Sequence, residues 1–154
     1  MENVIKNTSL KICHVTSVHP WDDIRIFRKE CVSLAKYYEN VYLVATNVTD
    51  RVVENVKVVG VNSMKKSSRL KRILFDKKKV FEKAISLNAD VYHLHDPELL
   101  SFVSKFKKLG KIVVFDSHED VPMDILDKDW LKYNWVKKTV SKLYNNYEKK
   151  VCKT

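Results

Sequence analysis

Short runs of apolar residues alternate along this chain with longer segments in which apolar residues recur every three or four positions. Runs of the first kind predict buried strands, and segments of the second kind predict amphipathic helices. On this pattern we expect strands over residues 10–16, 41–45, 52–61, 90–94 and 111–115. We expect helices over residues 22–38, 65–87, 97–108 and 130–151, with a stop at Gly110 after the third. The first has an apolar stripe of Ile24, Phe27, Cys31, Leu34, Ala35 and Tyr38. The stripe of the second is Leu70, Ile73, Leu74, Val80, Phe81, Ala84 and Ile85, and that of the last is Leu131, Trp135, Val136, Thr139, Val140, Leu143, Tyr144 and Tyr147.

The order of these elements predicts one doubly wound α/β domain over residues 1–154. Strands that alternate with helices pair in parallel through right-handed crossovers. We therefore expect a Rossmann-like parallel sheet of about five strands in the order 3-2-1-4-5. The strand order then reverses between the first and fourth strands, and ligands of such sheets bind outside the carboxyl ends of the strands at that point.

Three polar segments follow the strands that meet at this point: residues 17–25, 95–98 and 117–120. His118 is the main catalytic candidate, because an imidazole exchanges protons near neutral pH. The alternative is a histidine that caps the following turn. Asp116 either orients that imidazole or accepts from amides of its own loop. We expect Ser117, Glu119 and Asp120 to bind ligand hydroxyls. The alternative for Glu119 and Asp120 is that they stay solvated or cap the next turn.

The segment after the fourth strand contains a histidine and an aspartate. Asp96 precedes Pro97, which favours Asp96 as the N-cap of the next helix, with ligand binding as the alternative. His93 and His95 lie on one face of the strand because side chains alternate. We expect His93 to lie deeper, as a core histidine.

The segment after the first strand, which includes Ser17, leads into the first helix. Asp22 or Asp23 is expected to cap that helix. Arg25 is the predicted anion contact, because a guanidinium and free backbone amides at a helix N-terminus both attract anions. Arg28, one turn later, is expected on the surface in a pair with an acidic residue.

A metal site is a further interpretation of the motifs HLHD and SHED, which together with the preceding Asp116 hold three histidines and four carboxylates. Zinc and manganese bind such side chains. The interpretation needs additional ligands that the two motifs do not supply, so we expect no metal.

The charge of the chain indicates anionic partners. The formal net charge is +10 and the pI is near 9.4. Residues 65–83 hold nine basic and two acidic residues, a net charge of +7. The predicted helix there either has a solvated basic face or rests that face on anionic lipid while its apolar stripe packs inward. Nucleic acid is not expected, because no recognised binding motif is present.

Composition excludes several other classes. Only two glycines occur, Gly60 and Gly110, so Walker and GxGxxG loops are absent. The three cysteines are odd in number and widely spaced, which is typical of reduced thiols in a cytosolic protein. No apolar run reaches about 18 residues, and the N-terminus has no signal-peptide pattern, so a cytoplasmic location is expected.

Three segments resemble a known family: KICHVTSVHPWDDIRIFRKECVSLAKYYENVYLVA, ADVYHLHDPELL and KIVVFDSHED. In this order and spacing they are similar to the amino-terminal domain of a bacterial family-4 glycosyltransferase of the GT-B type. The similarity covers about residues 11–150. One departure is SVHPWDD in place of the glycines often found after the first strand, so a backbone cradle for phosphate is not expected.

The resemblance implies one half of a GT-B architecture, with the acceptor held here and the nucleotide-sugar donor held by a domain absent from this chain. It implies retaining sugar transfer, without a metal or other cofactor, to a glycan or lipid-linked acceptor in cell-surface polysaccharide biosynthesis. His118 then lies near the transferred sugar, His95 and Asp96 line the cleft, and residues 17–25 face donor phosphates or acceptor. The enzyme would work in the cytoplasm, peripheral on the inner membrane face.

The isolated chain is expected to be inactive, because holding both reactants together supplies much of a transfer enzyme's rate. The alternative to an enzyme is a non-catalytic α/β binding module, or a split-gene subunit, that recognises a phosphorylated ligand.

Overall fold

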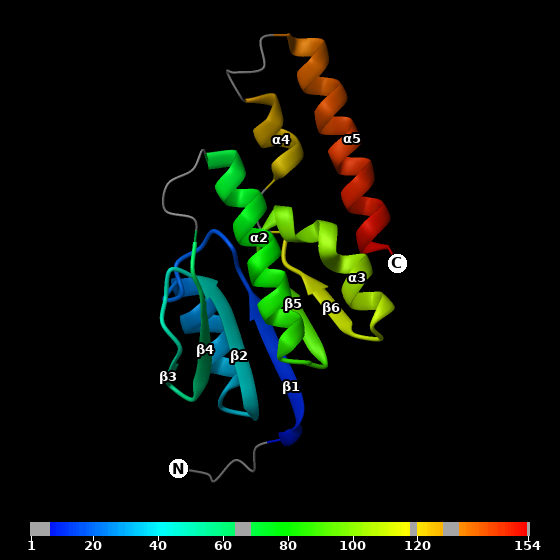
Figure 1. The fold of residues 1–154 in the computed structure, drawn as a ribbon. Helices are drawn as coiled ribbons and strands as arrows, with labels where there is room; N and C mark the ends of the chain where they lie inside the picture. Colours follow the sequence, from blue (N-terminus) through cyan, green and yellow to red (C-terminus); the bar gives the residue numbers. More distant parts are fainter. Residues whose placement is uncertain (1–6, 64–68, 118–119, 128–132, 154) are drawn as a thin grey trace. The chain divides into compact units, whose positions relative to one another are not determined.

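The computed structural model describes residues 7–63, 69–117, 120–127 and 133–153. The chain divides into two compact units, residues 1–116 and 117–154. The first unit contains a six-stranded sheet with helices packed against it, and the second contains two helices (Figure 1).

The sheet has the order β3-β4-β2-β1-β5-β6. All neighbouring strands are parallel except the pair β3 and β4. This is a Rossmann-like α/β fold, and the five expected strands lie in the expected order. The strands are β1 (Asn7–Val15), β2 (Tyr38–Thr46), β3 (Arg51–Val53), β4 (Val56–Val61), β5 (Val91–Leu94) and β6 (Ile112–Phe115).

The expected third strand is a hairpin rather than a single strand. β3 pairs antiparallel with β4, and the turn between them places Glu54 and Asn55 at positive φ, 49° and 65°. Two consecutive residues at positive φ match the right-handed twist of the flanking strands in a tight hairpin. The third expected strand is therefore β4 alone, and β3 adds a sixth, antiparallel edge strand.

One face of the sheet is covered by η1 (Ile24–Cys31), which has π-helical hydrogen bonding, and α1 (Val32–Leu34). The N-cap of η1 is Asp23, one of the two residues expected to cap this helix. Its side chain accepts hydrogen bonds from the backbone amides of Arg25 and Ile26. The predicted apolar stripe is wrong at Ile24, which is 71% exposed, while Ile26 is buried. The wider π-type turns change which positions face the sheet. The helix also ends earlier than predicted, since Tyr38 already belongs to β2.

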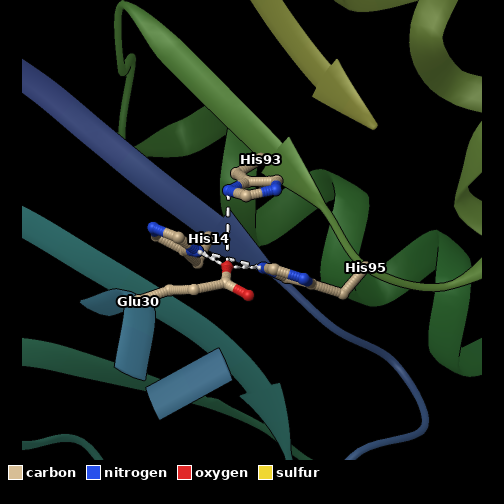
Figure 2. Close-up of side chains that lie close together, drawn as sticks. All are labelled: His14, Glu30, His93 and His95. Atoms are coloured by element: carbon tan, nitrogen blue, oxygen red, sulfur yellow. Dashed lines mark hydrogen bonds and ion pairs between the residues drawn. The ribbon is translucent and has the colours of Figure 1, made fainter. Parts of the chain in front are cut away.

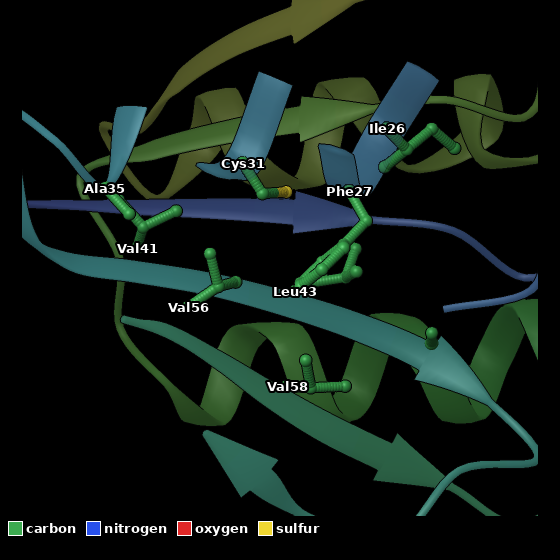
Figure 3. Close-up of a cluster of buried hydrophobic side chains, with 9 residues drawn as sticks. Ile26, Phe27, Cys31, Ala35, Val41, Leu43, Val56 and Val58 are labelled. Atoms are coloured by element: carbon green, nitrogen blue, oxygen red, sulfur yellow. The ribbon is translucent and has the colours of Figure 1, made fainter. Parts of the chain in front are cut away.

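A cluster of buried side chains joins η1 to the sheet (Figure 3). Alternate residues of β2 contribute to it, as expected for one face of a strand. Its members are Ile26, Phe27, Cys31, Ala35, Val41, Leu43, Ala45, Val56 and Val58. Burial of these apolar groups is the main favourable term that holds η1 in place.

The other face is covered by α2 (Arg69–Ser86), η2 (Pro97–Phe102) and α3 (Val103–Lys108). Aromatic rings link these helices to each other and to the sheet. Phe81 stacks on Phe102 with ring centroids 4.1 Å apart, and Tyr92 of β5 stacks on Phe106 at 4.2 Å. The stop predicted after α3 is confirmed, because Gly110 has a φ of 72°, the left-handed conformation that glycine adopts after helices.

Part of the apolar stripe predicted for α2 is confirmed, since Val80, Phe81 and Ala84 are buried. The first predicted turn, residues 65–68, lies outside the described residues, and so do the side chains of Leu70, Ile73 and Leu74. Within the described ranges, no helix is both long enough and apolar enough to cross a membrane.

The second unit consists of α4 (Val121–Leu126) and α5 (Asn134–Cys152). The Ser141 hydroxyl donates to the Pro122 carbonyl at 2.7 Å and joins the two helices. The apolar stripe predicted for the last helix is largely exposed, at Trp135 and Leu143 among others. The predicted helix start, residues 130–132, lies outside the described part of the chain.

Replacing Phe27 with alanine tests the role of the core cluster. Phe27 is fully buried, so Phe27→Ala should lower the free energy of unfolding by about 3–5 kcal/mol through lost burial and a residual cavity. Val52→Ala is the control, because Val52 lies on β3 and is 69% exposed. Urea denaturation followed by circular dichroism measures both, and equal losses would contradict the packing described here.

Candidate functional site

The candidate site lies where β1 pairs with both β2 and β5. His14 of β1 is in register with Leu43 of β2 on one side and with His93 of β5 on the other. The strand order therefore reverses at β1, as the sequence predicts. The polar residues after β1 and β5 emerge side by side at the carboxyl ends of the two strands, where open α/β sheets bind ligands.

Asp96 joins the two strand ends. Its side chain is buried, and Oδ2 accepts hydrogen bonds from the Thr16 hydroxyl at 3.0 Å and from the backbone amides of Ser17 and Val18. Asp96 occupies the N-cap position of η2, as expected, but its side chain makes no capping bond there. The carboxylate therefore holds the loop after β1 against the end of β5.

Ser17 lies between two carboxylates. Its hydroxyl is 3.2 Å from Asp96 Oδ2 and 2.9 Å from Glu98 Oε1. Burial, and next the negative charge of Asp96, raise the pKa of Glu98 above its usual value. Ser17 is itself buried, so it contributes to the loop's internal structure rather than presenting its hydroxyl to solvent.

Three imidazoles and one carboxylate converge beside this loop on the η1 face of the sheet (Figure 2). We call His14, Glu30, His93 and His95 the histidine cluster. Glu30 Oε2 lies 3.7 Å from His14 Nδ1, 3.6 Å from His93 Nδ1 and 3.7 Å from His95 Nε2. His14 Nδ1 and His95 Nε2 are 2.9 Å apart, at hydrogen-bond distance.

Burial keeps two imidazoles of the histidine cluster in their neutral form. Burial, and next the charge of His93, lower the pKa of His14 to about 3. Burial also lowers the pKa of His93, against the opposing effect of the Asp116 carboxylate. If all three imidazoles were protonated, the single carboxylate of Glu30 would leave the cluster with a net charge of +2. At neutral pH, His14 and His93 are therefore uncharged nitrogen donors.

Arg25 and Asp116 form a second layer around the cluster. The Arg25 guanidinium is ion-paired with Asp116 and lies 3.4 Å from Glu30 Oε1. Asp116 Oδ2 in turn lies 3.6 Å from His95 Nδ1. Asp116 therefore faces the imidazole of His95. Its expected contact with His118 concerns a residue outside the described part of the chain.

The predicted anion site at the start of η1 is corrected in one respect. The amides of Arg25 and Ile26 already donate to Asp23 Oδ1, both at 2.9 Å, so they are not available to a ligand. The prediction for Arg28 is confirmed, since it pairs with Glu54 on the surface. Asp22 is exposed.

The predicted depths of His93 on β5 and His95 directly after it are reversed. They do share a face, with ring centroids 4.4 Å apart. His95 is fully buried, whereas the His93 side chain is 21% exposed. His95 and Asp96 thus lie beneath the surface and support the neighbouring loops from below.

The candidate residues after β6 belong to the second unit. The Ser117 hydroxyl donates to Glu148 of α5 at 2.7 Å. Asp120 caps α4 by accepting from the Met123 amide, which is one of the two roles considered from the sequence. His118 and Glu119 lie outside the described residues.

His14 and Glu30 are cluster members that the sequence interpretation did not identify. His14 is a polar residue at an inward position of an apolar strand, and Glu30 lies on η1 between the buried residues Phe27 and Cys31. A polar residue on a buried face usually has a partner. A polar residue among buried apolar ones therefore indicates that His14 and Glu30 each have a partner, but it does not show which residues they contact.

A hollow of about 630 Å³ lies elsewhere in the first unit, at the end of β4 and along α2. Asn62, Ser63, Lys79 and Lys83 contribute to its lining, and no member of the histidine cluster does. Neither the histidine cluster nor the polar residues after β1 and β5 line this hollow, so we do not assign the candidate chemistry to it.

No protein-family model, curated protein or solved structure matches this chain.

The variant Asp96→Asn tests the joint between β1 and β5. The amide oxygen of asparagine can take the place of Oδ2, but it carries no charge, so the hydrogen bonds from Thr16, Ser17 and Val18 become weaker. The free energy of unfolding should fall by about 2–4 kcal/mol. Asp22→Asn removes the same charge from an exposed site and should change it by less than about 0.5 kcal/mol. Chemical denaturation of the two variants beside the parent measures this, and equal values would refute the role of Asp96.

Proposed function

We propose that this chain is the acceptor-binding domain of a retaining glycosyltransferase of the GT-B type, which transfers a sugar from a nucleotide-sugar to a glycan or lipid-linked acceptor. One observation carries the proposal. The three segments on which the resemblance rests meet through their polar side chains at one place. Arg25 of the first segment pairs with Asp116 of the third, and Asp116 faces His95 of the second.

These contacts suit a domain that must position residues at the ends of its strands. Asp116 is anchored by its ion pair with Arg25 and by its amide, which donates to the Leu94 carbonyl at 3.0 Å. His118 follows two residues later in the chain. In the proposed enzyme it lies near the transferred sugar, where a neutral imidazole can bond to a sugar hydroxyl. Positioning of this kind supplies a large part of catalysis by transfer enzymes.

The alternative is a non-catalytic module that binds a phosphorylated ligand. The net charge of +10 favours it in general terms. Against it, the best-placed cation at the strand ends, Arg25, is already flanked by the carboxylates of Glu30 and Asp116. We therefore retain the transferase as the main proposal.

Sugar transfer is the first test. Donor hydrolysis and transfer would be measured for this chain and for a longer version that includes the coding sequence after Thr154, with uridine and guanosine diphosphate sugars as donors. We expect activity in the longer protein only, and a loss of about 100-fold or more in His118→Ala. Arg28→Ala is the control, because Arg28 pairs with Glu54 on the surface. Inactivity of both lengths would favour the binding module. Full activity of the longer protein in the His118→Ala variant would contradict the catalytic role of His118.

We also propose that the domain works at an anionic membrane surface through α2. The helix Arg69–Ser86 carries seven basic and two acidic residues, a net charge of +5. Lys78 and Lys79 are exposed, while Val80, Phe81 and Ala84 on the same helix are buried. The apolar stripe thus packs inward and leaves cations for lipid headgroups, an arrangement that binds by charge and weakens with salt.

Vesicle binding tests this second proposal. At low salt the chain should bind vesicles that contain phosphatidylglycerol and should not bind vesicles of phosphatidylcholine alone. The double variant Lys78→Glu, Lys79→Glu should weaken binding by at least about tenfold, since each lysine near the surface contributes about 1 kcal/mol. Lys149→Glu, Lys153→Glu on α5 and its C-cap changes the total charge equally and is the control. Equal weakening by both pairs would show that net charge, not α2, is responsible.

A further inference from the structure

We propose that the histidine cluster is a binding site for a structural divalent transition-metal ion of the zinc type. The inference does not rest on the proposed function, whose chemistry requires no metal. It rests on four side chains from β1, η1, β5 and the residue directly after β5, which point toward one another (Figure 2).

The donor atoms have the chemistry and the spacing of a metal site. Three imidazole nitrogens and one carboxylate oxygen all lie within 4.8 Å of one another. In a tetrahedral zinc site with bonds of about 2.0–2.1 Å, neighbouring ligand atoms lie about 3.3 Å apart. The three distances from Glu30 Oε2, 3.6–3.7 Å, exceed this by a few tenths of an ångström. The 2.9 Å between His14 Nδ1 and His95 Nε2 is shorter by a similar amount.

Surrounding groups orient the ligands as the second layer of a metal site does. Asp116 faces Nδ1 of His95, the ring nitrogen opposite the one in the cluster. A carboxylate on the distal nitrogen sets the tautomer of a ligating histidine and strengthens it as a donor. Arg25 lies beside Glu30 Oε1, which leaves Oε2 as the oxygen directed at the three imidazoles.

The accessibility of the cluster also suits a cation. His14 and His95 are fully buried, whereas the side chains of His93 and Glu30 are 21% and 25% exposed. Val114, the register partner of His93 on β6, is 43% exposed, so an ion can enter from this side.

Four protein ligands fill a tetrahedral shell and leave no position for substrate, which indicates a structural ion rather than a catalytic one. Such an ion would bind β1, β5 and η1 to one another directly behind Asp96. Nitrogen and oxygen donors without thiolate favour zinc, cobalt or ferrous ions over soft monovalent copper.

The experiment uses the full chain, freed of metal with a chelator, and zinc sulfate as the probe. Zinc binding would be measured in competition with a chromophoric chelator, for the parent and for Glu30→Gln and His93→Gln, which remove the two more accessible ligands. His19→Gln is the matched control, because His19 lies near Asp96 and outside the cluster. Far-ultraviolet circular dichroism checks the fold of each variant, and the visible spectrum with cobalt reports the geometry of the bound ion.

We expect one equivalent of zinc in the parent and in His19→Gln, and affinity at least about tenfold lower in each cluster variant. Zinc should raise the unfolding temperature of the parent, since a ligand that binds only the folded state stabilises it. Less than one equivalent in the parent, an octahedral cobalt spectrum, or equal affinity in folded cluster variants would overturn the proposal. If neither cluster variant folds, the stoichiometry and the cobalt spectrum of the parent decide.

Discussion

The parallel pairing of β1 with both β2 and β5 is the constraint on which the candidate site depends. It places His14 beside His93 in one register and brings the loops after β1 and β5 out at the same edge of the sheet. The buried carboxylate of Asp96 then holds those loops together through hydrogen bonds to Thr16, Ser17 and Val18. A buried charge is costly unless such donors surround it, so the loop and the aspartate require each other.

The same face of the sheet carries two very different kinds of packing. Over β2 and β4 it is apolar, and η1 is held there by Phe27 and its neighbours. Over β1 and β5 it is polar, and Glu30 of the same helix meets three imidazoles. Apolar burial therefore fixes the helix, and the fixed helix delivers a carboxylate that would be unfavourable at that depth without partners. The polar cluster adds directionality that apolar packing lacks.

Sugar transfer and metal binding place different demands on this arrangement of β1, β5 and η1. Sugar transfer needs the segment after β6 to begin at a fixed point, and the contacts of Asp116 with Arg25 and His95 supply that. Metal binding needs the imidazoles and Glu30 to converge, and it leaves the reacting groups of a transferase untouched. An ion in the cluster would stiffen the supports beneath the loops, so the proposals are compatible and each can fail without the other.

Local chemistry in the sequence predicted a helix cap at Asp22 or Asp23, the Arg28 surface pair and the stop at Gly110, because apolar periodicity, capping and turn residues act over a few positions. The alternation of strands and helices predicted the order of five of the six strands. Tertiary structure alone decided that Asp96 bonds to the β1 loop, that His95 rather than His93 is buried, and that His14 and Glu30 join them. Alternation along a strand fixes which side chains share a face. It does not fix what packs on that face, because the helix and the neighbouring strand come from distant parts of the chain.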